Sequence, residues 1–260
     1  MSNRTKKRRR NEISHMADGT TMLDRTTRSK STFSTNHKTN GESNMKFTWS
    51  YSSLKDYINC PRKYHETKVL KRYFSPPTKE TTYGNEVHKA CEDYVSDGKP
   101  LAENYKFVQP MLDTLKDIPG EKSPEQRMAL DIDGKPCKWG DGWVRGIVDL
   151  AIIDGETAFI IDYKTGNNKY PDPDQLKLMA LMVFAHYPEV NIIKAGLLFV
   201  VKNSFLPEDY KREDIPKLWA VFKPHLARLE MSYDTGMWNP NPTPLCPWCP
   251  VKSCEHYGEK

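Results

Sequence analysis

Hydrophobic positions along the chain follow two spacings, and together they predict a protein of mixed helices and strands. Apolar residues three or four positions apart, preceded by capping residues, are typical of amphipathic helices. Such helices are expected from a cap at Ser52 or Ser53 toward Tyr64, and over residues 81–95, 102–115, 173–185 and 216–233. Shorter apolar runs predict strands over residues 128–132, 146–153, 157–164 and 192–201. This order of elements is typical of the α/β and α+β classes.

Two of the predicted strands, 146–153 and 157–164, flank the tripeptide Asp154-Gly155-Glu156. They predict a β-hairpin, because Asp-Gly between apolar runs is a strong hairpin signal. A loop made of the last two residues of the tripeptide places Asp149 directly opposite Asp162, whereas a loop made of its first two residues makes them diagonal neighbours. Side chains alternate along a strand, so both registers place the two carboxylates on one face, close enough to interact.

Three charged residues interrupt the apolar strands of this hairpin: Asp149, Asp162 and Lys164. Neighbouring carboxylates repel each other, and removing them from water costs further free energy, so positive charge is expected between them. Lys164 shares a strand face with Asp162 and supplies one charge. A hard divalent cation, bound through carboxylate oxygens, would supply the rest. The alternative interpretation is an ordinary ion pair between Asp162 and Lys164, with Asp149 as a polar residue near a strand end.

Net charge is unevenly distributed along the 260 residues, which together carry a formal charge of +5 and have a mean hydropathy of −0.74. Residues 1–45 hold ten Lys or Arg and four Asp or Glu, a net charge of +6, so the remainder carries −1. These first residues lack Trp, Tyr and Val. We expect a disordered basic tail over 1–45, because such a segment cannot bury enough apolar area to fold.

The basic run Lys6–Arg10 in this tail has no apolar segment after it and is therefore not a secretory signal. It could hold nucleic acid or act as a nuclear address; the alternative is a solvated extension, with Met45 as a second candidate for the start of the protein. The most apolar stretches, 178–185 and 192–201, are too short to cross a bilayer. We therefore expect no membrane association and a cytoplasmic location.

Cysteine residues gather near the C-terminal end of the chain. Cys246, Cys249 and Cys254 lie within one segment that is too rich in proline for a regular element. Without a secretory signal the thiols are expected to stay reduced, so this group suggests a metal site. Three ligands leave a tetrahedral site one short; Cys60 could complete it, or His256 could complete a Cys₃His zinc site.

Several short motifs follow one another in a specific order along the chain. They are residues 57–64 (Tyr-Ile-Asn-Cys-Pro-Arg-Lys-Tyr), 84–88 (Gly-Asn-Glu-Val-His), 146–150 (Gly-Ile-Val-Asp-Leu), 162–164 (Asp-Tyr-Lys) and Gln175. In this order they resemble the PD-(D/E)xK nucleases, specifically the RecB-type exonuclease branch found in phages and DNA-repair machines. The resemblance covers roughly Met45 to the C-terminus.

The resemblance implies an α/β, restriction-endonuclease-like fold, with a central mixed sheet flanked by helices. It places the nuclease domain at residues 46–235 and a cysteine-rich, metal-binding terminus at 236–260, packed on Cys60. It also implies that Cys60 joins Cys246, Cys249 and Cys254 in binding a 4Fe–4S cluster that links the two ends of the nuclease domain. The residues by themselves leave Zn²⁺, or a terminus without metal, as alternatives.

The resemblance further implies a role for each matching residue of the hairpin. Asp149 and Asp162 would bind Mg²⁺ or Mn²⁺, assisted by the main-chain carbonyl of Tyr163 and by His88. Lys164 would orient or activate the attacking water and stabilise the charge that develops on the phosphoryl group. These roles agree with general chemistry, because phosphodiester hydrolysis needs a cation that polarises the phosphoryl oxygen and a nucleophile available near neutral pH.

Gln175 would open the family's Gln-x-x-x-Tyr motif, which helps to position the active site and the DNA. Met179 stands where the Tyr of that motif is expected, so the chain departs from the pattern there. Glu125 would correspond, in a loose alignment, to an additional acidic position of some relatives.

The sequence therefore predicts a metal-dependent DNA exonuclease that acts in phage or in repair and recombination DNA processing, in the host cytoplasm if a phage encodes it. DNA is the expected substrate, and a recombination or single-strand-binding protein is a candidate partner; the oligomeric state does not follow from the sequence. One alternative is a structure-specific endonuclease or an RNA-directed nuclease with the same site. Another is a non-catalytic DNA-binding module in which the hairpin has lost its activity.

Overall fold

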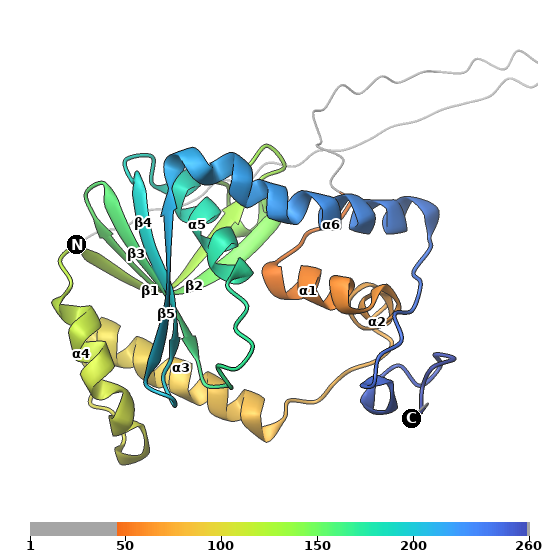
Figure 1. Cartoon of the computed structure of the whole chain (residues 1–260), viewed down its shortest axis with the longest axis horizontal. Helices are drawn as coiled ribbons and strands as arrows, with labels where there is room; N and C mark the ends of the chain where they lie inside the picture. The colour runs from red at the N-terminus through yellow and green to blue at the C-terminus, as the bar shows by residue number, and fades with distance from the viewer. Residues whose placement is uncertain (1–45, 259–260) are drawn as a thin grey trace, which may run out of the picture. The chain divides into compact units, whose positions relative to one another are not determined.

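The computed structural model describes residues 46–258, and its strands form a five-stranded sheet in the order β1-β2-β3-β4-β5 (Figure 1). The strands are β1 (Glu121–Leu130), β2 (Val144–Asp154), β3 (Thr157–Lys164), β4 (Ile192–Phe199) and β5 (Ser204–Lys211). Neighbouring strands are antiparallel except β3 and β4, which are parallel because helix α5 (Asp174–His186) connects them. The predicted mixed sheet is confirmed. The predicted tail over 1–45 lies outside the described residues.

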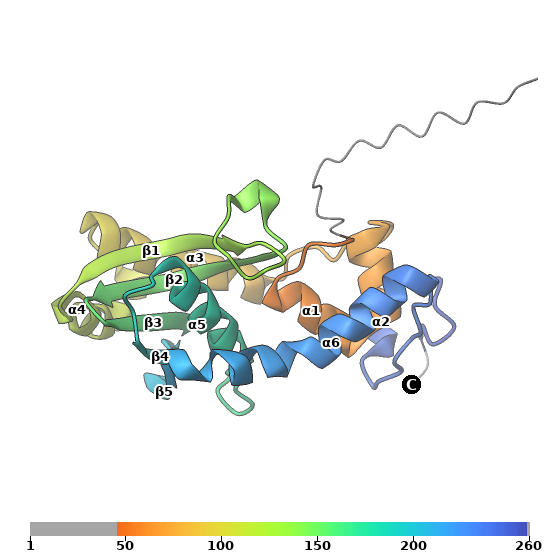
Figure 2. The same cartoon turned by 90° about the horizontal axis from the view of Figure 1, so that it is seen from above.

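Helices cover both faces of the sheet, and each face has its own hydrophobic core (Figure 2). Helices α3 (Lys79–Asp97) and α4 (Gln109–Asp117) pack on one face, and α5 and α6 (Ile215–Thr235) pack on the other. Side-chain alternation along the strands separates the cores: Ile160 of β3 joins the core of α5, and Ile161 joins the core of α3. Among residues 46–258, no helix is long and apolar enough to cross a bilayer.

The first helices of the described chain begin with a capping box. Ser50 Oγ accepts the backbone N–H of Ser53 at 3.3 Å, and Ser53 Oγ accepts the backbone N–H of Ser50 at 2.8 Å. Helix α1 (Tyr51–Asn59) therefore begins earlier than the sequence predicts, and the predicted cap at Ser52 or Ser53 is wrong. A short α2 (Pro61–Tyr64) and a π-helical segment (His65–Val69) follow.

Elsewhere, the predicted elements differ from the structure mainly at their ends. The helix expected over 102–115 divides into a 3₁₀ segment (Glu103–Val108) and α4, and the strand expected over 128–132 is β1, which begins at Glu121. Strand β5 is absent from the sequence prediction, because polar residues and Pro207 interrupt the apolar pattern expected of a strand. Because β5 lies at the edge of the sheet, the missing N–H of Pro207 needs no hydrogen-bond partner in a neighbouring strand. Further 3₁₀ turns are Trp139–Asp141, Arg212–Asp214 and Cys246–Trp248.

The β2–β3 hairpin takes the first of the two predicted registers. Asp154 pairs with Thr157, so the loop consists of Gly155 and Glu156. Gly155 has a φ of 58°, in the left-handed region that favours glycine at the first position of a two-residue loop. Continued along the strands, this register sets Asp149 opposite Asp162, as expected for that loop.

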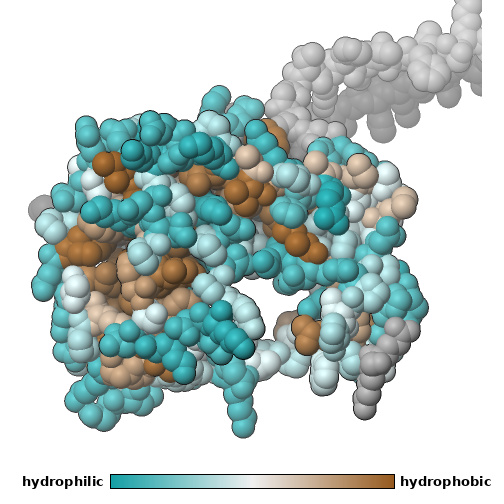
Figure 3. Space-filling model, viewed as in Figure 1, coloured by the Kyte–Doolittle hydropathy of each residue, from teal (hydrophilic) through white to brown (hydrophobic). Residues whose placement is uncertain are grey.

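Apolar side chains are partly exposed over the strands between α4 and α6, in the view of Figure 3. Phe205 of β5 is 51% exposed, and its ring covers Gly196 of β4. A Cβ at Gly196 would lie only 2.1 Å from that ring, so glycine is required for this packing. The ring therefore shields a part of the sheet that has no side chain of its own.

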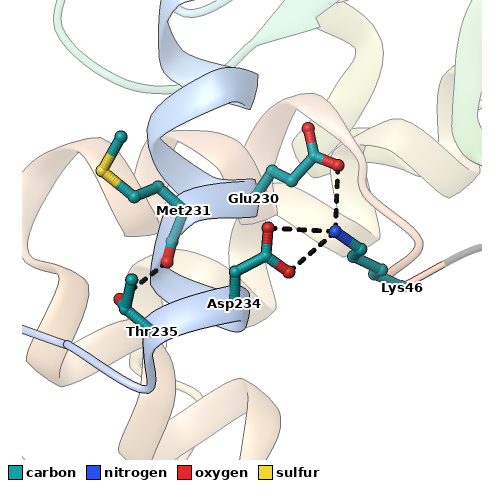
Figure 4. A network of polar contacts seen from close by, with 5 residues as sticks. All are labelled: Lys46, Glu230, Met231, Asp234 and Thr235. Carbon is teal, nitrogen blue, oxygen red and sulfur yellow. Dashed lines mark hydrogen bonds and ion pairs between the residues drawn. The ribbon is translucent and has the colours of Figure 1, made fainter.

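The first described residues are held against the end of α6. Lys46 Nζ lies 2.7 Å from Asp234 Oδ1 and 3.4 Å from Glu230 Oε1 (Figure 4). In the same turn, Thr235 Oγ1 donates to the carbonyl of Met231 at 2.7 Å. Exposed ion pairs of this kind contribute little to stability, so their effect is to orient the segment that leads into α1.

Arg212, directly after β5, closes the C-terminal end of α5. Its guanidinium donates to the carbonyls of Phe184 at 3.0 Å, Tyr187 at 2.7 Å and Val190 at 2.9 Å. The last carbonyls of a helix have no partner within the helix, so this side chain satisfies groups that would otherwise lack one. The planar guanidinium also lies over the Phe184 ring, with 5.1 Å between Cζ and the ring centroid. Arg212 thus fixes the helix that carries Gln175.

We expect Arg212→Ala to lower the free energy of unfolding by about 2 to 3 kcal/mol, because hydrogen bonds from a charged donor to buried acceptors are lost together. The measurement is urea unfolding followed by circular dichroism. Arg228→Ala, an identical change at an exposed position of α6, is the matched control and should change stability little. Equal losses in the two variants would contradict a specific anchoring role for Arg212.

Candidate active site

The two strands of the hairpin separate where their carboxylates begin. The last residues paired between β2 and β3 are Leu150 and Ile161. One position further, Asp149 Oδ2 accepts the backbone N–H of Tyr163 at 2.8 Å. From that point β2 continues against β1 and β3 continues against β4. A side-chain carboxylate thus takes the place of a ladder hydrogen bond, and a gap opens between the strands.

At Asp149, the regular alternation of the β2 side chains between the two faces of the sheet is also interrupted. Val148 packs in the core of α5 and Leu150 in the core of α3, although residues two apart normally share a face. Across the sheet, the register of β1 sets Glu125 opposite Asp149, and Glu125 has a left-handed φ of 48°. Such a conformation costs a residue with a side chain about 1 to 3 kcal/mol. Both strands are therefore distorted at one level, where two acidic side chains meet.

His88, Glu125 and Asp149 form a candidate metal-binding group, because one ligand atom from each lies within 4.8 Å of the others. His88 Nδ1 is 3.3 Å from Asp149 Oδ2. Burial lowers the pKa of His88, but the hydrogen bond and charge of Asp149 outweigh this and raise the pKa overall. Burial, followed by the charge of Asp149, raises the pKa of Glu125. The carboxylate oxygens of this group suit Mg²⁺ or Mn²⁺, and the imidazole nitrogen is a ligand typical of transition-metal ions.

Asp162 and Lys164 form the second part of the site. Asp162 is 1% exposed, and its Oδ2 lies 2.5 Å from Lys164 Nζ. Burial and then the charge of Asp149 raise the pKa of Asp162 to about 6, although Lys164 acts in the opposite direction. Lys164 Nζ also donates to Gln175 Oε1 at 3.0 Å. The ammonium is therefore held between a carboxylate of β3 and an amide in the first turn of α5.

The site draws side chains from both faces of the sheet through the gap between β2 and β3. His88 comes from α3, where Val87 and Cys91 anchor the helix in the core. Gly84, one turn earlier, lets α3 approach the end of β3, since a Cβ there would lie 3.2 Å from Thr165 Oγ1. The motif at residues 84–88 thus combines close packing with a histidine at the gap.

A cleft of about 780 Å³ opens onto this group of residues. His88, Glu125, Asp149 and Gln175 are among its lining residues. Asp162, which is buried, and Lys164, whose side chain is 33% exposed, are not among them. Met179, in place of the expected tyrosine, lines the cleft with an apolar side chain.

The structure places Tyr163 differently from the other candidate ligands. Its side chain is buried in the core of α3, with its ring centroid 5.9 Å from that of His88 in an edge-on arrangement. Its backbone N–H already binds Asp149. The role expected of its main-chain carbonyl stays a prediction.

Glu125 was indicated only by a loose alignment with an additional acidic position of some relatives. The predicted strand began at residue 128, so the sequence did not show that Glu125 faces Asp149 in the sheet. No alternation of apolar and polar positions could have shown it, because residues 121–127 are polar or charged apart from Pro124.

The four cysteines proposed as ligands line one small cavity, which brings Cys60 of the α1–α2 junction next to Cys246, Cys249 and Cys254. Backbone N–H groups point at the sulfur atoms: Cys60 Sγ accepts from Lys63 at 3.4 Å and from Asn241 at 3.5 Å. Cys246 Sγ accepts from Thr243 at 3.3 Å. Such donors stabilise thiolates and are typical of the surroundings of cysteine-bound metals.

The spacing of these sulfur atoms differs from that of a site for a single ion. Zn²⁺ with bonds of about 2.3 Å holds tetrahedral thiolates about 3.8 Å apart. Within residues 46–258, no three of the cysteine sulfur atoms lie within 4.8 Å of one another.

Comparisons with known proteins place these motifs in context. A family model described as "PD-(D/E)XK nuclease superfamily" matches residues 48–117 and 101–254. The crystal structure of a "Putative exonuclease" from Eubacterium rectale is similar, with 14% identity, a TM-score of 0.47, and coverage of 85% of this chain and 93% of that chain. The crystal structure of SSO0001 is also similar, with 14% identity, a TM-score of 0.42, and coverage of 81% and 87%. The comparison with curated proteins found no match.

We expect the stability of the metal-free protein to fall as the pH rises from about 4 to about 6, as far as Asp162 is concerned. Its pKa is about 6 in the folded protein and about 4 in the unfolded chain, so folding favours the protonated form. Asp162→Asn should therefore be more stable than the parent at pH 8 in EDTA, by up to about 3 kcal/mol, and this advantage should shrink toward pH 4.

Thermal unfolding between pH 4 and pH 8 measures this difference. Asp133→Asn, the same change at a side chain that is 70% exposed, is the control and should show no such pH dependence. A variant less stable than the parent at pH 8 would mean that the ion pair with Lys164 outweighs the repulsion from Asp149.

Proposed function

The chain belongs to the PD-(D/E)XK nuclease superfamily, and we propose that it is a divalent-metal-dependent deoxyribonuclease of the RecB-type exonuclease branch. The observation that supports this most directly is the position of Lys164. Its ammonium is held between Asp162 and Gln175 at the level where Asp149, His88 and Glu125 meet. A cation site and a fixed ammonium side by side are what phosphodiester hydrolysis requires.

In this proposal each residue of the site has a separate task. Asp149 and Asp162 would hold the divalent cation, with His88 and Glu125 as further ligands. A cation bound there would supply polarisation of the phosphoryl oxygen and a nucleophile available near neutral pH. Lys164 orients the attacking water and stabilises the negative charge that develops on the phosphoryl group. Gln175 is a positioning residue, because it contacts Lys164 through its amide oxygen.

DNA is the proposed substrate, and an exonuclease is favoured by the order of motifs from residue 57 to Gln175, which resembles the RecB-type branch. A structure-specific endonuclease or an RNA-directed nuclease would use the same residues and remains the second candidate. The non-catalytic DNA-binding module is disfavoured, since Asp149, Asp162 and Lys164 are all present and gathered at one site.

We also propose that residues 46–235 form the nuclease domain and residues 236–260 a metal-binding terminus. Helix α6 ends at Thr235, and the segment after it returns to Cys60, where Arg62 donates its N–H to the carbonyl of Asn239 at 3.3 Å. The N–H donors around Cys60 and Cys246 support a metal bound by these cysteines, and the resemblance to the RecB-type branch favours a 4Fe–4S cluster over Zn²⁺. The cluster would link the two ends of the domain and contribute folding free energy.

Cleavage of end-labelled DNA in Mg²⁺ and in Mn²⁺ tests the nuclease assignment. We expect linear DNA to be degraded and closed circular DNA to survive. Lys164→Ala and Asp162→Asn should reduce the single-turnover rate on the order of 10²- to 10³-fold, because each removes charge needed in the transition state. Lys164→Ala should still bind the metal in a calorimetric titration, since an ammonium is not a ligand.

Lys169→Ala, at an exposed position five residues later, is the control and should cleave like the parent. Cleavage within a few-fold of the parent in both site variants would contradict the proposal. Degradation of closed circles as fast as linear DNA would favour the endonuclease instead.

We expect protein purified without oxygen to be brown and to contain about four iron and four sulfide ions per chain, as a cluster with four cysteine ligands requires. Cys249→Ala should lose colour and unfold at a lower temperature, because removing a ligand also removes folding free energy. Cys137→Ala changes a thiol outside the group and should keep both properties. Stoichiometric zinc without iron would support the alternative site, and protein without either metal would contradict both.

A further inference from the structure

We propose that the ion pair between Lys55 and Asp172 positions Lys164 for catalysis, because it joins helix α1 to the start of the helix that carries Gln175. This inference rests on the proposed nuclease function and adds two positioning residues to its site. Neither Lys55 nor Asp172 is among the residues that line the cleft, so both act through Gln175, which does line it.

Asp172 connects two helices that are far apart in the sequence. Its Oδ2 lies 2.5 Å from Nζ of Lys55, in the middle of α1. Its Oδ1 accepts the backbone N–H of Asp174, the first residue of α5, at 3.3 Å. One carboxylate thus binds α1 and the beginning of α5 at once, where the two helices lie close to each other in Figure 1.

The chain from Asp172 to Gln175 is short and stiff. Asp172 stands between Pro171 and Pro173, and the ring of a proline fixes its φ at about −65°. Pro173 is the residue that precedes α5, with a φ of −76°, and Gln175 follows in the first turn of the helix. The position of the Asp172 carboxylate therefore determines where the Gln175 side chain begins.

The loop before Asp172 provides no comparable support. Strand β3 ends at Lys164, and residues 166–171 are exposed. The hydrogen bond that these loop residues make within the described part of the chain is local, from the N–H of Lys169 to Oδ1 of Asn167 at 2.8 Å. Without the ion pair, the start of α5 would be held mainly by the core side chains that begin at Leu176.

The orientation of Lys164 depends on Gln175. Lys164 Nζ lies 2.5 Å from Asp162 Oδ2 and donates to Gln175 Oε1 at 3.0 Å. An ammonium has three donors, so two fixed partners also fix the direction of the third. If Gln175 moved away, the ammonium would be free to turn about its contact with Asp162. A displacement of about 1 Å at a reacting centre can cost on the order of 10²-fold in rate.

The ion pair is suited to positioning and not to global stabilisation. Burial acts to raise the pKa of Asp172, but Lys55 and then Tyr51 outweigh burial and lower the pKa overall, so the carboxylate stays charged near neutral pH. The side chains of Lys55 and Asp172 are 44% and 37% exposed, and pairs of this exposure contribute little to the stability of a fold. Loss of the pair should therefore displace the start of α5 without unfolding the protein.

Single-turnover cleavage of end-labelled DNA in Mg²⁺ tests the proposal in the full chain. Asp172→Asn and Lys55→Met should each lower the rate at saturating DNA about tenfold and leave the half-saturating DNA concentration within about twofold of the parent. Lys55→Arg should restore most of the rate, because a guanidinium also pairs with a carboxylate. A loss that appears only in the half-saturating concentration would overturn the proposal and show that Lys55 contacts DNA directly.

A second set of variants tests whether the effect passes through Gln175. In a Gln175→Ala background, Asp172→Asn should lower the rate no further, because the contact that it supports is already lost. Asp174→Asn is the matched control, since it removes the same charge two residues later from a side chain whose partner is Lys177 of the same helix, at 2.6 Å. It should cleave like the parent. Additive losses from Asp172→Asn and Gln175→Ala, or an equal loss in Asp174→Asn, would overturn the proposal.

Hydrogen exchange of the metal-free protein gives a measurement that does not depend on cleavage. Asp172→Asn should speed exchange of the backbone amides of residues 176–179 roughly threefold and leave the amides around His88 in α3 unchanged. Thermal unfolding verifies that each variant is folded. Unchanged exchange at residues 176–179 would overturn the proposal. Absence of cleavage by the parent would overturn the nuclease assignment, whereas the exchange rates would still decide whether Asp172 fixes the start of α5.

Discussion

Two carboxylates in neighbouring strands cannot be buried side by side without compensation, and the structure around the cleft follows from that constraint. Asp149 and Asp162 stand opposite each other in the register of the hairpin, and pairing between β2 and β3 ends one residue before them. The carboxylate of Asp149 then accepts the backbone N–H of Tyr163. This hydrogen bond holds Asp149 without bringing the Asp162 carboxylate closer. Lys164 offsets part of the charge of Asp162. The remaining repulsion is a stability cost that a bound cation would remove.

The gap that results from this repulsion also explains how distant segments reach one site. Helices on opposite faces of a continuous sheet cannot share a ligand, because the strands lie between them. Where β2 and β3 separate, His88 from α3 contacts Asp149, and Gln175 from α5 accepts from Lys164, the partner of Asp162. Each helix must then be fixed independently. Close packing at Gly84 fixes α3, and Arg212 fixes the far end of α5.

Local sequence signals were enough to predict the positions of the hairpin residues, but not those of the site residues that other elements contribute. The Asp-Gly turn and the alternation of β3 determine that Asp162 and Lys164 share a face, so these contacts follow from the sequence. The position of Glu125 depends on the register between β1 and β2, which are joined by a long connection whose length does not fix the pairing. The reversal of faces at Asp149 is also not readable from the sequence, because it arises only when both strands distort together.

The cysteine-rich terminus acts on the cleft through α1. Cys60 directly follows this helix, and Asn241 of the terminus donates its side-chain amide to the carbonyl of Asn59, the last residue of the helix, at 2.9 Å. At the other end of α1, Tyr51 and the cap residue Ser50 line the cleft. A bound cluster would therefore hold one wall of the cleft by fixing the helix behind it. Loss of the cluster would thus affect DNA binding as well as folding, although none of the four candidate ligand cysteines is among the residues that line the cleft.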